Sequence, residues 1–347
     1  MKRFKKIILW TLIPVCLELA GFTYFNSSYL NDETSFNTKK VEIAAKKANK
    51  INVPLSDTAQ NIDASYSGNY VSYCNNGTIN VINTSDNSQK TISFDDGSSV
   101  SKYVWLPDRD IMLIAEKYSD SYGESCIKFE SYNAAKDEKT VLTKNNTALS
   151  ITLDISDYDV QNIALSTTTN VTYVQVGSSG GLSRVYRIDV MQQLQKVSLL
   201  SSGLGNIATT NKADKLVYED DTYDRIRIAG VKDPIATGES AIHYLLGTDS
   251  QDRIYIGNGQ NGKVSKIFVA DTSKSSSQWN IITLKKAANK SDIHVTRDGK
   301  IYVNDSASGK VTELLSGKEI SYKGKFVKMY DLGIISKNSG TLTGVLF

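Results

Sequence analysis

The only two histidines of the chain, His243 and His294, each follow an isoleucine within a repeated pattern. Two imidazoles at equivalent positions of neighbouring repeats could share a ligand, or one of them could serve as a general base near neutral pH. A zinc site would also need carboxylates or thiolates, and the sequence has no Cys or His spacing typical of zinc. Because histidine also has ordinary packing roles, we expect no metal and no cofactor, and catalysis by this pair is the weaker interpretation.

A second set of candidates consists of tyrosine, aspartate and asparagine side chains in polar segments. Tyrosine buries apolar area at a low entropy cost and hydrogen-bonds through its hydroxyl group, which suits the recognition of proteins or glycans. The chain contains 19 tyrosines, so their presence in polar turns also has a purely compositional explanation. The residues that we expect to bind a ligand are Tyr118, Asp120, Tyr122, Tyr158, Asp221, Tyr223 and Asn258.

The elements that must carry these residues are β-strands. Ala241-Ile-His-Tyr with Ile254-Tyr-Ile-Gly-Asn returns about fifty residues later as Asp292-Ile-His-Val with Ile301-Tyr-Val-Asn. Each copy has the pattern of a strand, a polar turn and a second strand, and β-branched and aromatic runs of this kind continue from Ile51 onward. Repeats of about 35 to 60 residues are typical of propeller blades. The sequence therefore predicts an all-β chain folded as a β-propeller of about seven blades, with six or eight as open alternatives.

The last predicted unit, which ends with Leu342-Thr-Gly-Val-Leu-Phe, is one strand short of a four-stranded blade. The segment Lys50-Ile-Asn-Val-Pro-Leu can supply that strand and close the ring, which removes two exposed sheet edges. The loops between the second and third strands and the loops between blades emerge at one end of a propeller, which we call the loop face. The candidate ligand-binding residues would gather there, in segments 117–124, 145–159, 220–225 and 258–262.

Two stretches resemble known propeller families. Asp298-Gly-Lys-Ile-Tyr-Val-Asn-Asp-Ser, continuing through Gly309-Lys-Val-Thr-Glu-Leu, resembles a blade of the NHL and streptogramin-lyase-like propellers. Ser67-Gly-Asn-Tyr-Val-Ser-Tyr with Ile79-Asn-Val-Ile is similar to the propellers of TolB and to the N-terminal propellers of dipeptidyl peptidases. The resemblance covers residues 50–347 in pattern and implies the propeller fold, and it transfers no functional residue to this chain.

The N-terminal sequence has the features of a membrane anchor. Met1-Lys-Arg-Phe-Lys-Lys carries four positive charges ahead of an apolar run from Ile7 to Phe25, which is nearly long enough to cross a bilayer. Glu18 stands where cleavage after Ala20 would need a small residue, so we expect the anchor to be retained. The predicted order is a cytoplasmic head (1–6), a single transmembrane helix (7–25), a polar stalk (26–49) and a propeller (50–347) outside the cell membrane.

The charge beyond the N-terminal segment is balanced. Four of the 40 basic residues and one of the 37 acidic residues precede residue 31, so 36 of each follow. Proteins that bind nucleic acids concentrate Lys and Arg into patches, and this balance gives no reason to expect a nucleic-acid partner. Cys74 and Cys126 fall at non-matching positions of different predicted blades, so we expect no disulfide between them.

These observations favour a binding function over a catalytic one. The predicted protein is a single-pass, extracytoplasmic propeller that acts as a binding or scaffold module for an envelope or membrane protein, or for a polysaccharide. The alternative is a lyase or hydrolase of glycans or peptides that works in the central channel with His243 or His294 as the general base. The sequence offers no acid that would pair with either histidine, which makes this alternative the weaker one.

Overall fold

The computed structural model describes residues 14–24, 50–95, 97–178 and 180–347. Residues 14–24 form a helix, and no described helix is long and apolar enough to cross a membrane. The predicted span 7–25 lies only partly within the described residues, and the predicted head (1–6) and stalk (26–49) lie outside them. The chain divides into two units, Met1–Lys46 and Lys47–Phe347, and the second contains every described strand.

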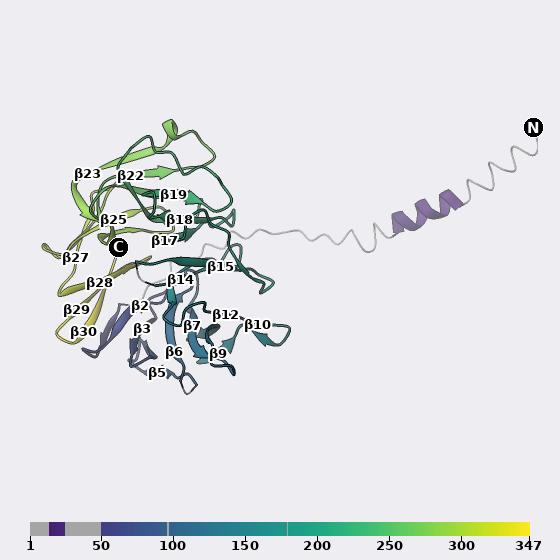
Figure 1. The fold of residues 1–347 in the computed structure, drawn as a ribbon, viewed down its shortest axis with the longest axis horizontal. Helices are drawn as coiled ribbons and strands as arrows, with labels where there is room; N and C mark the ends of the chain where they lie inside the picture. Colours follow the sequence, from purple (N-terminus) through teal and green to yellow (C-terminus); the bar gives the residue numbers. More distant parts are fainter. Residues whose placement is uncertain (1–13, 25–49, 96, 179) are drawn as a thin grey trace, which may run out of the picture. The chain divides into compact units, whose positions relative to one another are not determined.

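The described residues of the second unit form a β-propeller of seven antiparallel blades, in agreement with the predicted propeller of about seven, and the blades follow chain order around a ring (Figure 1). Blade 1 consists of β2 (Gln60–Ala64), β3 (Tyr70–Asn75), β4 (Thr78–Asn83) and β5 (Gln89–Ile92). Blade 2 contains β6 (Ser99–Trp105), β7 (Ile111–Ser119), β8 (Ser125–Asn133) and β9 (Glu138–Val141). Blade 3 consists of β13 (Asp159–Ser166), β14 (Val171–Gly177), β15 (Ser183–Ile188) and β16 (Leu194–Lys196).

Blades 4 to 7 continue the same order from the centre outward. Blade 4 consists of β17 (Leu204–Thr209), β18 (Leu216–Asp220) and β19 (Arg225–Ile228), and blade 5 of β20 (Ile242–Thr248), β21 (Ile254–Gln260), β22 (Lys263–Ala270) and β23 (Asn280–Asn289). Blade 6 consists of β24 (Ile293–Val295), β25 (Ile301–Asp305), β26 (Lys310–Glu313) and β27 (Glu319–Ser321). Blade 7 consists of β28 (Lys325–Tyr330), β29 (Gly333–Asn338), β30 (Thr341–Leu346) and β1 (Asn52–Pro54). Two short 3-10 helices, η2 (Ser276–Gln278) and η3 (Lys290–Asp292), flank β23.

The first strand of the propeller belongs to its last blade. β1 pairs antiparallel with β30, with Asn52 opposite Thr343 and Val53 opposite Leu342. Ile51 and Val53 are almost fully buried, so the strand is held by side-chain packing as well as by its backbone. The yellow strands β28–β30 lie beside the purple strands β2 and β3 in Figure 1, and the ring closes at this point.

Two blades depart from the four-stranded pattern. In blade 2, β12 (Ser150–Thr152) joins β9 at the outer edge of β8, and β10 (Thr143–Lys144) pairs with β11 (Thr147–Ala148) between them. Part of the predicted insertion 145–159, residues 147–148 and 150–152, is therefore sheet rather than a loop. Blade 4 has three strands, and the backbone N–H groups of Val231 and Ile235 donate to carbonyls of β19, which partly covers its outer edge.

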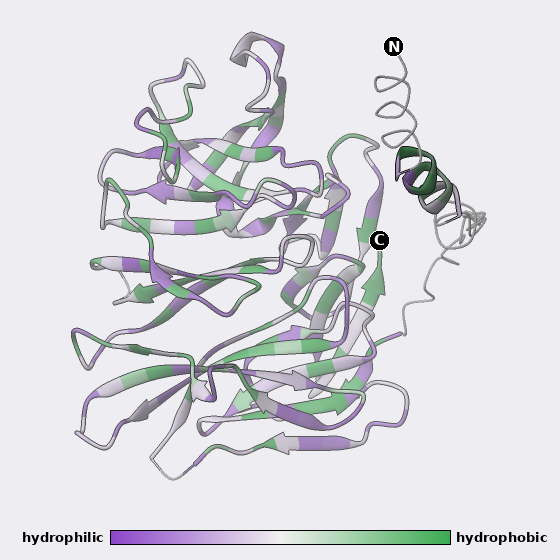
Figure 2. Ribbon diagram, turned by 90° about the vertical axis from the view of Figure 1, so that its right-hand side faces the viewer, coloured by the Kyte–Doolittle hydropathy of each residue, from purple (hydrophilic) through white to green (hydrophobic). Residues whose placement is uncertain are grey.

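The core lies between neighbouring blades, because each strand turns alternate side chains toward the next sheet. Phe129 of blade 2, for example, packs in one buried cluster with Val160 and Val174 of blade 3. Figure 2 shows the resulting alternation of hydrophobic and hydrophilic residues along the strands. Cys74 and Cys126 are buried in this core as free thiols.

The two histidines do not occupy equivalent positions, which corrects the prediction from the repeat. Both lie on the first strand of a blade, but His243 is opposite Asn258 whereas His294 is opposite Tyr302. In the repeat, Tyr255 of blade 5 corresponds to Tyr302 of blade 6. Tyr255 is opposite Gly247 and not opposite a histidine. Blade 5 has a longer first strand with a bulge after Leu245, so the two Ile-His pairs fall at different levels of their blades.

Candidate functional site

The chain topology places the predicted ligand-binding residues at the loop face. Three of them lie in or beside the loop between β7 and β8, two lie in the loop between β18 and β19, one lies near the end of β21, and Tyr158 precedes β13. In an antiparallel blade these positions share one end of the sheet. The seven residues nevertheless differ widely in exposure, and the structure does not gather them into one site.

The loop between β7 and β8 displays one tyrosine to solvent. Asp120 accepts hydrogen bonds from the backbone N–H groups of Tyr122 and Glu124, each at 2.9 Å, so this carboxylate organises the turn. Tyr122 is 90% exposed. Tyr118 is half-buried, and the Lys128 ammonium lies 5.4 Å from the centre of its ring. Tyr122 is thus the residue of this loop that a partner can reach most easily.

Tyr158 and Asn258 are parts of the interior rather than of the surface. Tyr158 packs in the core cluster between blades 2 and 3, and its carbonyl accepts a hydrogen bond from Lys117 at 2.9 Å. Asn258 is buried opposite His243. Successive residues along a strand point alternately inward and outward. A residue near a polar turn can therefore have a buried side chain, and nearness to the turn does not predict exposure.

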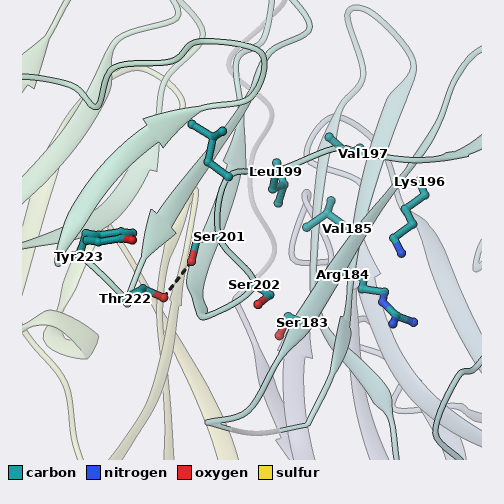
Figure 3. Close-up of a pocket in the computed structure, with 11 residues that line it drawn as sticks. Ser183, Arg184, Val185, Lys196, Val197, Leu199, Ser201, Ser202, Thr222 and Tyr223 are labelled. Carbon is teal, nitrogen blue, oxygen red and sulfur yellow. Dashed lines mark hydrogen bonds between the residues drawn. The ribbon is translucent and has the colours of Figure 1, made fainter.

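Tyr223 lines a groove between blades 3 and 4, with a volume of about 440 Å³. Its walls come from the start of β15, from the end of β16 with the loop that follows, and from the loop between β18 and β19. Figure 3 shows Arg184 and Lys196 on one side and Thr222 and Tyr223 on the other. Of the seven predicted residues, only Tyr223 lines this groove.

The groove combines an exposed aromatic ring with hydroxyl groups and positive charge. Tyr223 is 62% exposed, and the Arg227 guanidinium lies 5.8 Å from the centre of its ring. The Ser201 and Thr222 hydroxyls are 2.9 Å apart and hydrogen-bonded. Lys196 is exposed and has no ion pair among the residues that the structure describes, whereas Arg184 is paired with Asp154. An aromatic face, hydroxyls and a free cation together suit a polar, anionic ligand.

The histidines form no shared site. His243 is 1% exposed, and its ring nitrogens contact Thr237 and Arg225. Burial lowers the pKa of His294 to about 4, and the positive charge of Lys328 adds to this effect, so the imidazole is neutral at pH 7. No group of three or more Cys, His, Asp or Glu side chains that could hold a metal occurs within the described ranges. Within the described residues, the hydrogen-bond partners of the His243 ring are Thr237 and Arg225 and include no carboxylate.

Sequence reasoning missed Arg297, which lies at the end of the channel opposite the loop face. Its guanidinium donates to the Pro107 carbonyl at 3.0 Å and to the Asn211 side chain at 3.5 Å, and so links blades 6, 2 and 4. Cavities of about 530 and 120 Å³ lie beside it. A single arginine in a polar turn carries no pattern in the sequence, and its central position follows only from the ring.

Comparison with known proteins identifies the fold. No family model and no curated protein matches the chain. The β-propeller domain of Cps50 (Swd1) from Myceliophteria thermophila is similar in structure, with a TM-score of 0.54 at 9% identity over 86% of this chain and 100% of that domain. A luciferin-regenerating enzyme aligns at a TM-score of 0.42 and 10% identity, over 74% of this chain and 87% of the enzyme. The likeness to the Cps50 domain indicates the fold and not the activity. By the arrangement of its blades and by this likeness, the chain has the fold of a β-propeller.

Proposed function

We propose that this chain is a membrane-anchored, extracytoplasmic binding module that holds an acidic envelope polysaccharide in the groove between blades 3 and 4. The observation that carries the proposal is the open, hydroxyl-lined groove in which Tyr223 faces Arg184 and Lys196. An aromatic ring stacks against the apolar face of a sugar, and hydroxyls and cations bind its polar groups. The alternative is that the chain serves as a scaffold that binds an envelope protein.

The chemistry of the groove favours a polysaccharide over a protein. Strong protein interfaces place apolar and aromatic anchors in a desolvated centre. The groove instead mixes Ser and Thr side chains with Val and Leu side chains, and its lining has one aromatic ring. The lining residues are Ser183, Arg184, Val185, Lys196, Val197, Leu199, Leu200, Ser201, Ser202, Thr222 and Tyr223.

Replacing the groove tyrosine is expected to weaken polysaccharide binding. Tyr223→Ala should reduce the affinity of the full-length protein for polygalacturonate about tenfold, because it removes the aromatic ring of the site. Calorimetric titration in gentle detergent measures this, with neutral dextran as the uncharged comparison. We also expect the affinity to fall when the salt concentration is raised, because salt screens Lys196.

The matched control is Tyr122→Ala, because Tyr122 is more exposed than Tyr223 but lies outside the groove. This variant should bind polygalacturonate as the natural chain does. Equal losses in the two variants would show that the groove is not the site. The double variant Tyr118→Ala, Tyr223→Ala tests the loop face more widely. If it folds and keeps full binding, the loop face is excluded as the binding site. If it also still captures one envelope protein, the scaffold function is favoured.

The proposed location rests on the basic head and the apolar run of the sequence, together with the helix at residues 14–24. That helix carries the apolar side chains of Leu17 and Leu19. Leu17→Lys with Leu19→Lys should move most of the full-length chain from the membrane fraction to the soluble fraction. Leu315→Lys, at an exposed leucine of blade 6, is the control and should stay with the membrane. No change in the first variant would contradict the anchor.

A further inference from the structure

A cavity of about 280 Å³ lies inside the ring, where four blades meet. Asp63 of blade 1, Lys102 of blade 2, Asn162 of blade 3 and Lys328 of blade 7 all line it. Each of these residues is the first paired residue after a register shift in the inner strand of its blade. Because a bulge redirects the side chain next to it, four inner strands turn a polar group into the same space.

The side-chain oxygens of Asp63 and Asn162 already accept hydrogen bonds within the protein. The Asp63 carboxylate accepts the Ala64 N–H at 2.9 Å through one oxygen and the Lys328 ammonium at 2.6 Å through the other. The Asn162 side-chain oxygen accepts the Ile163 N–H at 2.9 Å. The Asn162 NH₂ group has no hydrogen-bond partner among the described residues, so it remains available as a donor to a ligand.

Lys102 adds a positive charge that the protein does not neutralise. Within the described part of the chain it forms no hydrogen bond and no ion pair, although it is only partly exposed. Burial lowers the pKa of Lys102, the charge of Lys328 lowers it further, and Asp63 opposes both effects. His294, the other titratable group beside Lys328, is neutral at pH 7. Lys328 is ion-paired with Asp63, whereas Lys102 has no ion pair in the described part of the chain, so two basic side chains and one acidic side chain line the cavity.

We propose that this cavity binds a small carboxylate, held by Lys102 and Lys328 and oriented by the NH₂ group of Asn162. One carboxylate balances the positive charge of Lys102 and accepts hydrogen bonds from Lys102, Lys328 and Asn162. The volume lies just below the range of about 300 to 1,000 Å³ typical of ligand pockets, so the ligand is a free small acid rather than a polymer. The site is separate from the groove between blades 3 and 4, with which it shares no lining residue.

Calorimetric titration of the full-length protein tests this site. The probes are lactate and glucuronate, each compared with its neutral amide, and inorganic phosphate. We expect at least one carboxylate to bind saturably, its amide to bind at least tenfold more weakly, and Lys102→Met to reduce the affinity for the carboxylate at least tenfold. Lys318→Met, at an exposed lysine of blade 6, should leave the affinity unchanged.

Three results would overturn the proposal: no binding of either carboxylate, unchanged binding in Lys102→Met, or tighter binding of phosphate. Thermal melting without ligand gives an independent readout, because Lys102→Met removes a partly desolvated charge without a partner and should melt at or above the temperature of the natural chain. A lower melting temperature would mean that Lys102 already has a partner within the protein. Tyr223→Ala should bind the carboxylate normally, so that failure of the groove and failure of this cavity are distinguishable.

Discussion

Val53→Asp is expected to lower the free energy of unfolding by roughly 3 to 5 kcal/mol. Val53 is 0% exposed and lies in the middle of β1, between Ile51 and Leu55, whose side chains are also buried. A carboxylate at this position has no partner in the apolar cluster that joins blades 7 and 1. Because β1 is the strand that closes the ring, its release also exposes the edge of β30. Denaturant unfolding followed by tryptophan fluorescence measures the change.

Asn52→Asp is the matched control for this variant. Asn52 is exposed on the same strand and opposite Thr343, so the same new charge stays in water. Its effect should remain within about 0.5 kcal/mol, as is usual for surface substitutions. If both variants unfold at the same denaturant concentration as the natural chain, then β1 does not hold the ring closed in solution.

Asp249→Ala is expected to cost about 3 to 5 kcal/mol, because it removes the acceptor at the centre of a buried network. One oxygen of Asp249 accepts the N–H groups of Gln251 and Arg253, at 2.9 and 3.0 Å. The other accepts the Arg253 Nε–H and, at 2.9 Å, the Tyr255 hydroxyl. Burial raises the pKa of Tyr255, which keeps its hydroxyl protonated as a donor. The Tyr255 hydroxyl also lies 3.2 Å from the Gly299 carbonyl, so the network ties blade 5 to blade 6.

Glu319→Ala is the control for the loss of an acidic side chain. Glu319 and Lys310 form an ion pair at 2.7 Å, but their side chains are 53% and 43% exposed. Water solvates both charges well, so the variant should lose less than about 1 kcal/mol. The two variants are compared by equilibrium unfolding in urea. Similar losses in the two would contradict the structural role assigned to the Asp249 network.

The residues of the proposed binding groove were much harder to predict than the fold. Polar turns identified the loop face, and Tyr223 does line a groove there. The other groove residues include Ser201 and Ser202, whose type and spacing resemble those of any polar loop. Tyr158 and Asn258 were selected by their nearness to turns, yet they are buried because of the faces on which they lie. Residue type alone does not report which side of a sheet a residue occupies.

The repeated Ile-His pairs show a similar limit of sequence patterns. The repeat predicted the blades correctly, but it did not predict where the two histidines lie within them. The repeat correctly indicated neighbouring blades, because Ile254-Tyr-Ile and Ile301-Tyr-Val lie on the second strands of blades 5 and 6. It did not indicate that blade 5 has a longer inner strand with a bulge, which separates His243 from the level of His294. A bulge leaves the residue types unchanged but shifts the register of every residue beyond it.

The sequence by itself determined that this chain folds as an all-β propeller of about seven blades, with six or eight left open. Strand alternation and turn residues are local properties, and their repetition limits how many blades the chain can form. Only the tertiary structure decided which side chains meet at the centre. Lys102 and Lys328 are far apart in the chain and line one cavity because blades 7, 1 and 2 are neighbours in a closed ring. The cavity that they line depends on ring closure, which the incomplete last unit indicated, and on strand bulges, which have no local signature in the sequence.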